Sequence, residues 1–310
     1  MEYTILGKTG FRVSRLGIGT AEIGFERMPL ASVSELLLFA LDHGINVLDT
    51  ARGYESSEEL IGKAIGHRRR DFIIVSKCGY GEIEGMESLP PWSKKKITAS
   101  VDQSLKKLRT DHIDIMLLHT CTKDVLQKGE ALEALLIAQQ KGKIRFIGYS
   151  GDNEDGLFAL SLEPIDVVEI SLNVTDQYNA EKLLPLAKEK KVGVLVKRPL
   201  GNCPWKDPLE LSPQYGREYG EEYRRRFKAM GLKAADLGIE EDGWAEFFLR
   251  FVLSFPEIHV VLIGVTKLEH LVQDIQTLKK GVLPQPVWHK VRESFIKAQS
   301  LSGSIWLGQG

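Results

Sequence analysis

Charged and polar side chains stand where several short apolar runs of the sequence end. These side chains are Asp49, Lys77, His119, Ser150, Asn173, Lys197 and Arg198. Lys77 is the most informative of them, because an unpaired ammonium group buried beside an apolar strand is costly. Lys77 therefore needs a carboxylate partner, and Asp49, at the end of the preceding apolar run, is the expected one. Carboxylate, ammonium and imidazole groups gathered in one place can carry out general acid–base chemistry.

Short apolar strands alternate with amphipathic helices along the chain, and these elements must position the polar groups. Strands are predicted at residues 16–19, 46–49, 72–77, 113–118, 144–149, 166–170, 192–196 and 260–262, and helices at 32–43, 58–65, 96–108, 130–140, 155–161, 180–190, 244–254 and 268–278. Continuous apolar strands are typical of a parallel sheet buried on both faces. Eight strand–helix units predict an α/β fold, a closed (β/α)8 TIM barrel. The carboxyl ends of barrel strands face one mouth, so the polar groups are expected to meet there.

Two local signals concern the first strand–helix unit. Ser32 and Glu35 match a capping box that would start the first long helix, and Gly44 is placed to end it. An open doubly wound sheet is the alternative fold, and it normally carries a G-x-G-x-x-G turn after its first strand. The segment 17–22 lacks the third glycine, and its first glycine lies inside the predicted strand. The closed barrel is therefore favoured.

Three further segments flank or interrupt the barrel pattern. Residues 3–13 predict an N-terminal β-hairpin. Residues 202–243 form an insert after the seventh strand that is too long for a simple loop, with a helix predicted at 223–230. Two interpretations of this insert stay open, a lid over the active site and a disordered surface insert. The tail 284–310 carries three aromatic residues and is expected to pack against the rest. Together these segments predict a single domain, 1–310.

Composition narrows the class of protein. The 41 Lys and Arg residues nearly balance the 42 Asp and Glu residues, which argues against binding to nucleic acid or to a membrane surface. No apolar stretch approaches the ~18 residues of a membrane span. The chain start shows no secretory signal, and the three cysteines show no C-x-x-C spacing. A reduced, cytoplasmic protein without a disulfide framework or zinc site is expected.

The sequence resembles the aldo-keto reductase superfamily from the N-terminal hairpin through Leu278. The matching motifs are Asn46-Val47-Leu48-Asp49-Thr50-Ala51 with Tyr54, Ser76-Lys77, Leu117-Leu118-His119, Gly148-Tyr149-Ser150, Asn173, Arg198-Pro199-Leu200-Gly201 and Ile263-Gly264. Four positions match the catalytic tetrad of that superfamily, namely Asp49, Tyr54, Lys77 and His119. Each motif alone is weak, but their order on successive strands of a predicted barrel makes the resemblance specific.

The resemblance implies NAD(P)H-dependent reduction of an aldehyde or ketone to an alcohol, with a small-molecule carbonyl substrate. The nicotinamide would supply the hydride and Tyr54 the proton. Lys77 is expected to lower the pKa of Tyr54 and stabilise its phenolate, with Asp49 holding Lys77 charged. His119 would hydrogen-bond the carbonyl oxygen. The chemistry needs no metal, and the sequence has no H-E-x-x-H motif.

The resemblance also implies a set of residues that bind the cofactor. The set is Thr20, Ser150, Glu169, Lys197, Arg198, Leu200, Gly201, Gly264, Thr266, Lys267, His270 and Asp274. Ser150 and Glu169 would contact the carboxamide, and residues 198–202 would wrap the pyrophosphate. NADP(H) is favoured on family grounds, with NAD(H) open.

This chain departs from the family pattern at several of these positions. Gly151 and Glu169 stand where the family often has Asn and Gln, and Lys197 stands where an aromatic ring commonly stacks on the nicotinamide. The usual Lys and Arg of an NADPH site are replaced by Gly264 and His270, so Lys267 is the expected substitute in an anion site.

Other functions remain open from the sequence. A regulatory subunit that binds the cofactor with little turnover, like the potassium-channel β subunits, would share the fold. A barrel aldolase could use Lys77 or Lys197 as a Schiff-base amine. A dehydrogenase that oxidises an alcohol uses the same chemistry in reverse. Phe25, Trp92 and either Trp205 or Trp306 could line a pocket or simply pack in the core. The sequence leaves the substrate and the oligomeric state undetermined.

Overall fold

The computed structural model describes residues 1–211 and 220–309. Eight parallel strands close into a barrel in the order β10-β3-β4-β5-β6-β7-β8-β9. Their bounds are β3 Leu16–Gly19, β4 Val47–Asp49, β5 Ile73–Cys78, β6 Ile113–His119, β7 Ile144–Ser150, β8 Val167–Ser171, β9 Gly193–Lys197 and β10 Val260–Gly264. The predicted (β/α)8 barrel is confirmed, and each of its predicted strands lies within two residues of the observed one.

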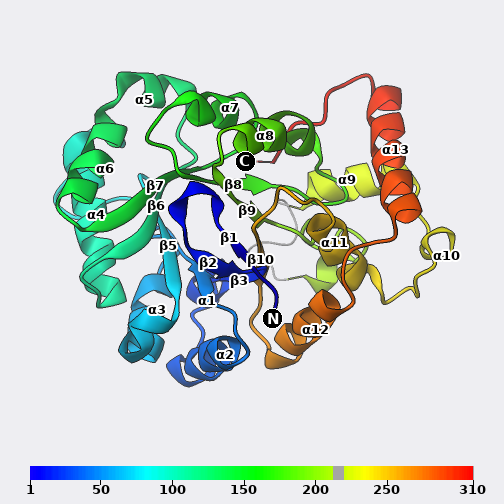
Figure 1. Cartoon of the computed structure of the whole chain (residues 1–310), viewed down its shortest axis with the longest axis horizontal. Helices are drawn as coiled ribbons and strands as arrows, with labels where there is room; N and C mark the ends of the chain where they lie inside the picture. Colours follow the sequence, from blue (N-terminus) through cyan, green and yellow to red (C-terminus); the bar gives the residue numbers. More distant parts are fainter. Residues whose placement is uncertain (212–219, 310) are drawn as a thin grey trace.

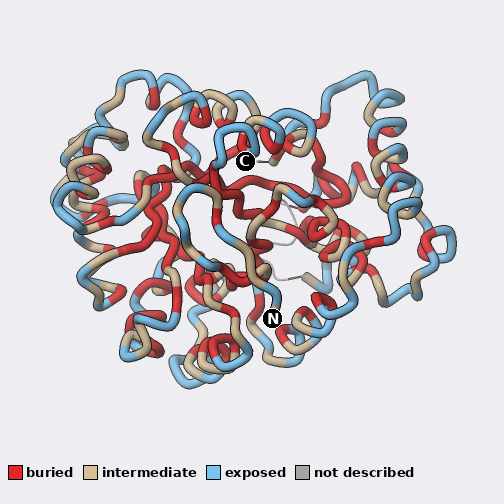
Figure 2. Tube along the Cα trace, viewed as in Figure 1, coloured by how far each residue is buried: buried red, intermediate tan, exposed pale blue. Residues whose placement is uncertain are grey.

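Helices surround the barrel as a ring (Figure 1). The principal ones are α2 Leu30–Asp42, α3 Ser57–Ile65, α4 Lys94–Leu108, α6 Glu130–Gln140, α7 Asn153–Ser161, α8 Tyr178–Glu189, α11 Trp244–Leu253 and α12 Leu268–Lys279. Shorter helices are α1 Ala21–Phe25, η2 Gly66–Asp71 and α5 Lys123–Lys128. Burial concentrates on the strands and on the inner faces of the helices (Figure 2). Among the described residues, no helix is long and apolar enough to cross a membrane.

The predicted capping box is wrong. Helix α2 begins at Leu30 with Pro29 in the N-cap position, and no side chain caps it. Ser32 therefore lies inside the first turn rather than before it. Proline sets the extended backbone that precedes a helix, and the good helix former Leu30 continues directly from it. Gly44 does end the segment, with a left-handed φ of +85°.

The N-terminal hairpin closes the amino end of the barrel. It comprises β1 Tyr3–Ile5, the turn η1 Gly7–Thr9 and β2 Arg12–Ser14, as predicted. Leu6 and Val13 are fully buried in the cluster of strand side chains that fills the barrel interior. Gly7, with φ +48°, lies so close to β9 that an added Cβ would be 2.3 Å from the Gly193 nitrogen. This contact fixes the hairpin across the barrel floor (Figure 1).

The insert and the tail pack beside the barrel mouth. The insert contains η3 Pro208–Glu210, α9 Glu221–Met230 and α10 Ala234–Leu237, and α9 confirms the helix predicted at 223–230. Residues 212–219 of the insert lie outside the described residues, so the lid stays a prediction, as does the single-domain division. The tail forms α13 Gln285–Ser302. As expected it packs against the rest, because Trp306 is 1% exposed and the guanidinium of Arg226 in α9 lies 5.5 Å from the centroid of its ring.

Candidate active site

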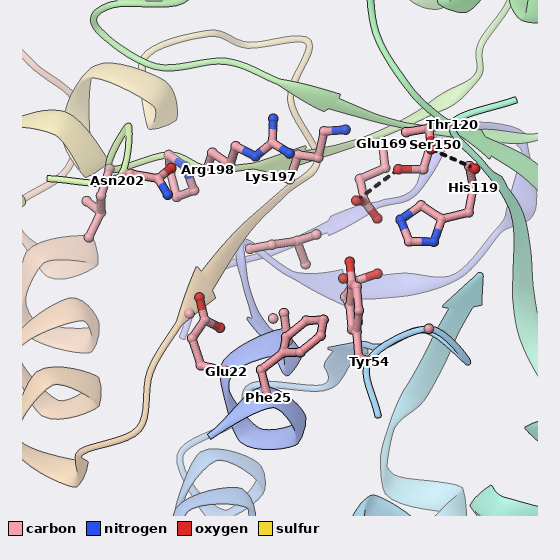
Figure 3. A pocket seen from close by; sticks show the side chains of 18 of the residues that line it. Glu22, Phe25, Tyr54, His119, Thr120, Ser150, Glu169, Lys197, Arg198 and Asn202 are labelled. Atoms are coloured by element: carbon pink, nitrogen blue, oxygen red, sulfur yellow. Dashed lines mark hydrogen bonds between the residues drawn. The ribbon is translucent and has the colours of Figure 1, made fainter. Parts of the chain in front are cut away.

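A cavity of about 510 Å³ opens at the carboxyl ends of the barrel strands. Its wall is formed by Gly19, Ala21, Glu22, Phe25, Asp49, Gly53, Tyr54, Tyr80, His119, Thr120, Ser150, Glu169, Lys197, Arg198, Pro199, Leu200, Asn202, Cys203, Leu262 and Gly264. Tyr54, His119 and Glu169 point toward one another there, and Phe25 and Glu22 project from α1 (Figure 3). Five of the polar residues predicted to meet at one mouth line this cavity, namely Asp49, His119, Ser150, Lys197 and Arg198, whereas Lys77 and Asn173 are not part of its wall.

Lys77 lies behind the cavity wall in the expected ion pair with Asp49. Its Nζ atom is 2.6 Å from each Asp49 carboxylate oxygen and 3.1 Å from the carbonyl oxygen of Thr50. The Lys77 side chain is fully buried. Burial alone would lower the pKa of Lys77, but Asp49 and Glu169 reverse this effect and raise it. Lys77 is therefore a permanent cation inside the barrel.

Tyr54 follows β4 in a turn that brings its ring over Lys77. The Lys77 Nζ atom lies 5.0 Å from the centroid of the Tyr54 ring. The turn is held by a hydrogen bond from the Tyr54 nitrogen to the Ala51 carbonyl oxygen at 3.0 Å. Gly24 approaches it closely, since an added Cβ would be 1.9 Å from the Tyr54 carbonyl oxygen. The glycine therefore permits α1 to pack against the turn.

The net effect of the surroundings on the pKa of Tyr54 is opposite to the expected one. Burial raises the pKa of Tyr54, Lys77 lowers it, and the carboxylates of Asp49 and Glu169 raise it again. Lys77 thus acts in the predicted direction, but the net pKa is raised rather than lowered. The single cation Lys77 would by itself lower the pKa of Tyr54, but burial and the two carboxylates outweigh it.

His119 ends β6 beside Tyr54, with ring centroids 5.8 Å apart. Burial lowers the pKa of His119 to about 3, and the positive charges of Lys77 and Lys197 act in the same direction. The imidazole is therefore neutral at ordinary pH. Its Nδ1 atom is buried and has no hydrogen-bond partner among the described residues. A neutral ring in this position can donate one N–H to a carbonyl oxygen.

Ser150 and Glu169 form a buried polar pair on neighbouring strands. The Ser150 hydroxyl donates to Glu169 Oε1 at 3.1 Å (Figure 3). Glu169 Oε2 lies 3.2 Å from Lys77 Nζ, yet no group of the described residues makes a hydrogen bond to this buried atom. Burial alone would raise the pKa of Glu169, but Lys77 and Lys197 reverse this and lower it. Oε2 can thus accept a hydrogen bond from a ligand at the cavity wall.

Two cations follow one another at the end of β9, and both have protein partners. Lys197 Nζ lies 3.4 Å from Asp152 Oδ2. Arg198 donates from Nη1 to the carbonyl oxygen of Gln309 and, at 3.2 Å, to the Ser171 hydroxyl. The Arg198 guanidinium therefore binds the tail in this structure, although the residue lines the cavity.

Comparison with known proteins assigns the chain to a family. The model of the aldo/keto reductase family matches residues 15–295. The chain belongs to the aldo/keto reductase family. L-galactose dehydrogenase of Arabidopsis thaliana is 31% identical over 90% of this chain and 93% of its own length. An uncharacterised oxidoreductase of Bacillus subtilis is 30% identical over 87% of this chain and 89% of its own length.

A solved structure supports the same assignment. The holo form of an aldo-keto reductase from Bacillus halodurans is 25% identical and superimposes with a TM-score of 0.79, covering 95% of this chain and 96% of its own. The chain is thus an oxidoreductase of a family that uses nicotinamide cofactors.

In this aldo/keto reductase, several residues predicted to bind the cofactor lie away from the cavity wall. They are Thr20, Gly201, Thr266, Lys267, His270 and Asp274. Thr20 is fully buried and donates its hydroxyl to the Asp49 carbonyl oxygen at 2.8 Å. Gly201 has φ +54°, and an added Cβ would be 3.1 Å from Asn173 Oδ1. Both residues therefore make close contacts within the protein, and their contact with a cofactor stays a prediction.

The start of α12 carries the residues predicted for the adenine end. Lys267 and His270 are 65% and 52% exposed, and each lies 3.9 Å from a carboxylate oxygen of Glu269. Asp274 is 9% exposed, and burial raises its pKa to about 7. The Glu269 carboxylate thus stands between the two groups that would form an anion site.

The structure adds a wall residue that sequence reasoning missed. Glu22 lines the cavity. Glu22 comes three residues after the first barrel strand, so the rule that polar groups follow strand ends would have found it. Of the aromatic candidates Phe25 lines the cavity, whereas Trp205 packs against Phe248 with tilted rings whose centroids are 4.7 Å apart. Trp92 and Trp306 also lie outside the wall.

Proposed function

We propose that this protein reduces an aldehyde or ketone to an alcohol with NADP(H), and that Tyr54 donates the proton. The observation that carries the proposal is the buried Asp49–Lys77 pair directly behind Tyr54. Tyr54 and His119 both line the cavity in front of this pair. These groups together can hold, orient and release one proton at one point of the cavity wall.

The residues at the wall fit a nicotinamide. The buried Glu169 Oε2 atom lacks a hydrogen bond, and the N–H₂ group of a carboxamide would supply one. Ser150 would contact the same carboxamide, and Leu200 and Arg198, which also line the cavity, would contact the pyrophosphate. When bound, the nicotinamide supplies the hydride that carbonyl reduction requires.

The proton is handled by the chain itself. The neutral His119 would donate an N–H to the carbonyl oxygen and orient it, which stabilises the charge that develops there. The Tyr54 hydroxyl would then donate its proton to that oxygen. The Lys77 ammonium stabilises the resulting phenolate, and Asp49 keeps Lys77 in place and charged.

NADP(H) is the favoured cofactor of the proposal. Thr266, Lys267 and His270 at the start of α12 would bind the 2′-phosphate, with the Lys267 side chain as its main partner. The exposed position of Lys267 leaves it free to reach a ligand, although Glu269 competes for its charge.

The structure favours this chemistry over Schiff-base catalysis by Lys77. An amine nucleophile must be accessible and deprotonated. Lys77 is fully buried, and its pKa is raised by two carboxylates. It therefore meets neither requirement.

The proposal is tested by the oxidation of NADPH and NADH with 4-nitrobenzaldehyde and a few dicarbonyl compounds. Wild type and Tyr54→Phe are compared under the same conditions. Turnover should fall by at least about 10²-fold in the variant, the scale of a lost general acid, while cofactor binding stays unchanged. Tight cofactor binding by the wild type without turnover on any carbonyl compound would instead support the regulatory subunit.

A further inference from the structure

Glu169 links two groups that the proposed mechanism uses separately. Its Oε1 atom accepts the Ser150 hydroxyl at 3.1 Å, and its Oε2 atom lies 3.2 Å from Lys77 Nζ. The Glu169 side chain is 2% exposed, so water and salt screen its charge only weakly. Glu169 therefore acts electrically on the cluster behind Tyr54, whatever else it contacts.

Lys77 is shared between two carboxylates. Asp49 contacts its Nζ atom with both oxygens at 2.6 Å, and Glu169 contacts it at 3.2 Å. Burial and the neighbouring Glu169 raise the pKa of Asp49 well above its ordinary value, whereas Lys77 and Lys197 lower the pKa of Glu169, so Glu169 is the carboxylate that ionises more readily. Lys197, the next cation along the wall, offsets this charge only in part because it is paired with Asp152 at 3.4 Å. Glu169 thus supplies a persistent negative charge beside Lys77.

The groups that face Tyr54 come from four strands of the barrel. Lys77 on β5 favours the ionised phenolate, whereas Asp49 on β4 and Glu169 on β8 favour the neutral phenol. His119 on β6 is neutral and adds no charge of its own. The phenolate would place a further negative charge beside the ionised Glu169, so the balance depends on this carboxylate.

We propose that Glu169 is a positioning residue that acts through Lys77, and that its charge keeps Tyr54 in the neutral, proton-donating form over a wider pH range. The inference rests on the proposed function, in which Tyr54 exchanges the proton. The phenol donates only below its own pKa. Reduction therefore declines as pH rises through that value, and alcohol oxidation, which needs the phenolate, rises over the same range.

Glu169→Gln tests the inference, because it removes the charge and keeps the shape. The dependence of kcat/KM on pH is measured for carbonyl reduction and for oxidation of the corresponding alcohol. The fall of kcat/KM for reduction and its rise for oxidation should both move to lower pH by about one unit relative to wild type. Glu169→Asp keeps the charge and should stay closer to wild type than Glu169→Gln. Glu169→Met, of similar volume, is a second charge-removing variant in case the glutamine protein does not fold.

Glu22→Gln is the matched control, because it removes a carboxylate from another part of the same wall. The Glu22 carboxylate lies beside Gly264, with both oxygens 2.9 Å from the position of an added Cβ there, and belongs to α1 (Figure 3). This variant should leave both pH dependences in place, whatever it does to KM. An equal shift in Glu22→Gln and Glu169→Gln would overturn the specific role of Glu169.

A second readout does not depend on turnover. Tyr54 is replaced by 3-fluorotyrosine, and its fluorine chemical shift is followed with pH in the protein with native Glu169 and with Glu169→Gln. The titration midpoint should be lower in the variant. Coincident midpoints, together with activity that Tyr54→Phe abolishes, would overturn the inference and leave the proposed function standing. Activity retained by Tyr54→Phe would overturn both.

Discussion

The Nζ atom of Lys77 lies at the same distance, 2.6 Å, from the two carboxylate oxygens of Asp49. Neither side chain is more than 5% exposed. A buried ion pair of this kind is not in itself a strong source of stability, because desolvation offsets much of the attraction. Removing one partner is different, because the other is left as an uncompensated charge inside the protein.

Lys77→Met should therefore lose both activity and stability. Turnover is expected to fall by at least about 10²-fold, since the phenolate of Tyr54 loses its cation. The free energy of unfolding should fall by about 3 kcal/mol, because the Asp49 carboxylate loses its partner. Activity assays and denaturant titrations measure the two effects. The double variant with Asp49→Asn should be less destabilised than the sum of the single changes, and simple additivity would contradict the pairing.

Gly24→Ala should displace the turn that carries Tyr54. Its Cβ would meet the Tyr54 carbonyl oxygen at 1.9 Å, and backbone atoms cannot move aside as the end of a side chain can. We expect a loss of at least about 1 kcal/mol in stability and a clear fall in kcat. Gly66→Ala is the control, because an added Cβ there meets nothing within 4 Å. Equal behaviour of the two variants would show that Gly24 does not position Tyr54.

His119 should not titrate in the working pH range of the enzyme. Burial lowers its pKa to about 3, so kcat/KM should show no inflection near the ordinary histidine value of about 6.5. A pH profile of wild-type activity from about pH 5 to 8 tests this, and an inflection that disappears in His119→Gln would contradict it.

The lowered pKa of His119 also makes the stability of the protein depend on pH. As pH falls below about 6.5 the unfolded chain takes up a proton at His119, but the folded chain does not until about pH 3. The contribution of His119 to stability is therefore present above about pH 6.5 and is lost as pH falls. Relative to His119→Gln, wild type should lose about 2 kcal/mol between pH 7 and pH 5. Denaturant titrations at the two pH values measure the difference.

Much of this fold could be predicted because its strands are short, continuous and apolar. The Asp49–Lys77 pair could be predicted too, because a lysine at the end of a buried strand must find a carboxylate. The contacts between the tail and the barrel could not be predicted. Nothing in the residues around Arg198 indicates that its guanidinium binds the carbonyl oxygen of Gln309. The capping box failed for a local reason, because Pro29 starts α2 before the Ser32 signal is reached.

Cofactor preference should depend on the opposing charges at the start of α12. Lys267→Ala should raise the KM for NADPH about tenfold and leave that for NADH nearly unchanged, because only NADPH carries the 2′-phosphate. Glu269→Gln should lower the KM for NADPH, since the carboxylate 3.9 Å from Lys267 would no longer compete for its charge. Steady-state kinetics with both cofactors measure the effects. Equal changes for NADPH and NADH in Lys267→Ala would place the 2′-phosphate elsewhere.

The hairpin that fills the amino end of the barrel has a kinetic consequence. Leu6 and Val13 close that end, so the cavity beside Tyr54 is approached from the mouth at the carboxyl ends of the strands. Two molecules that meet there must use the same entrance. The molecule that binds deeper in the cavity has to bind first and dissociate last, because the molecule that binds second blocks its exit. We therefore expect binding in a fixed order, with the last product to leave acting as a competitive inhibitor of the first substrate to bind.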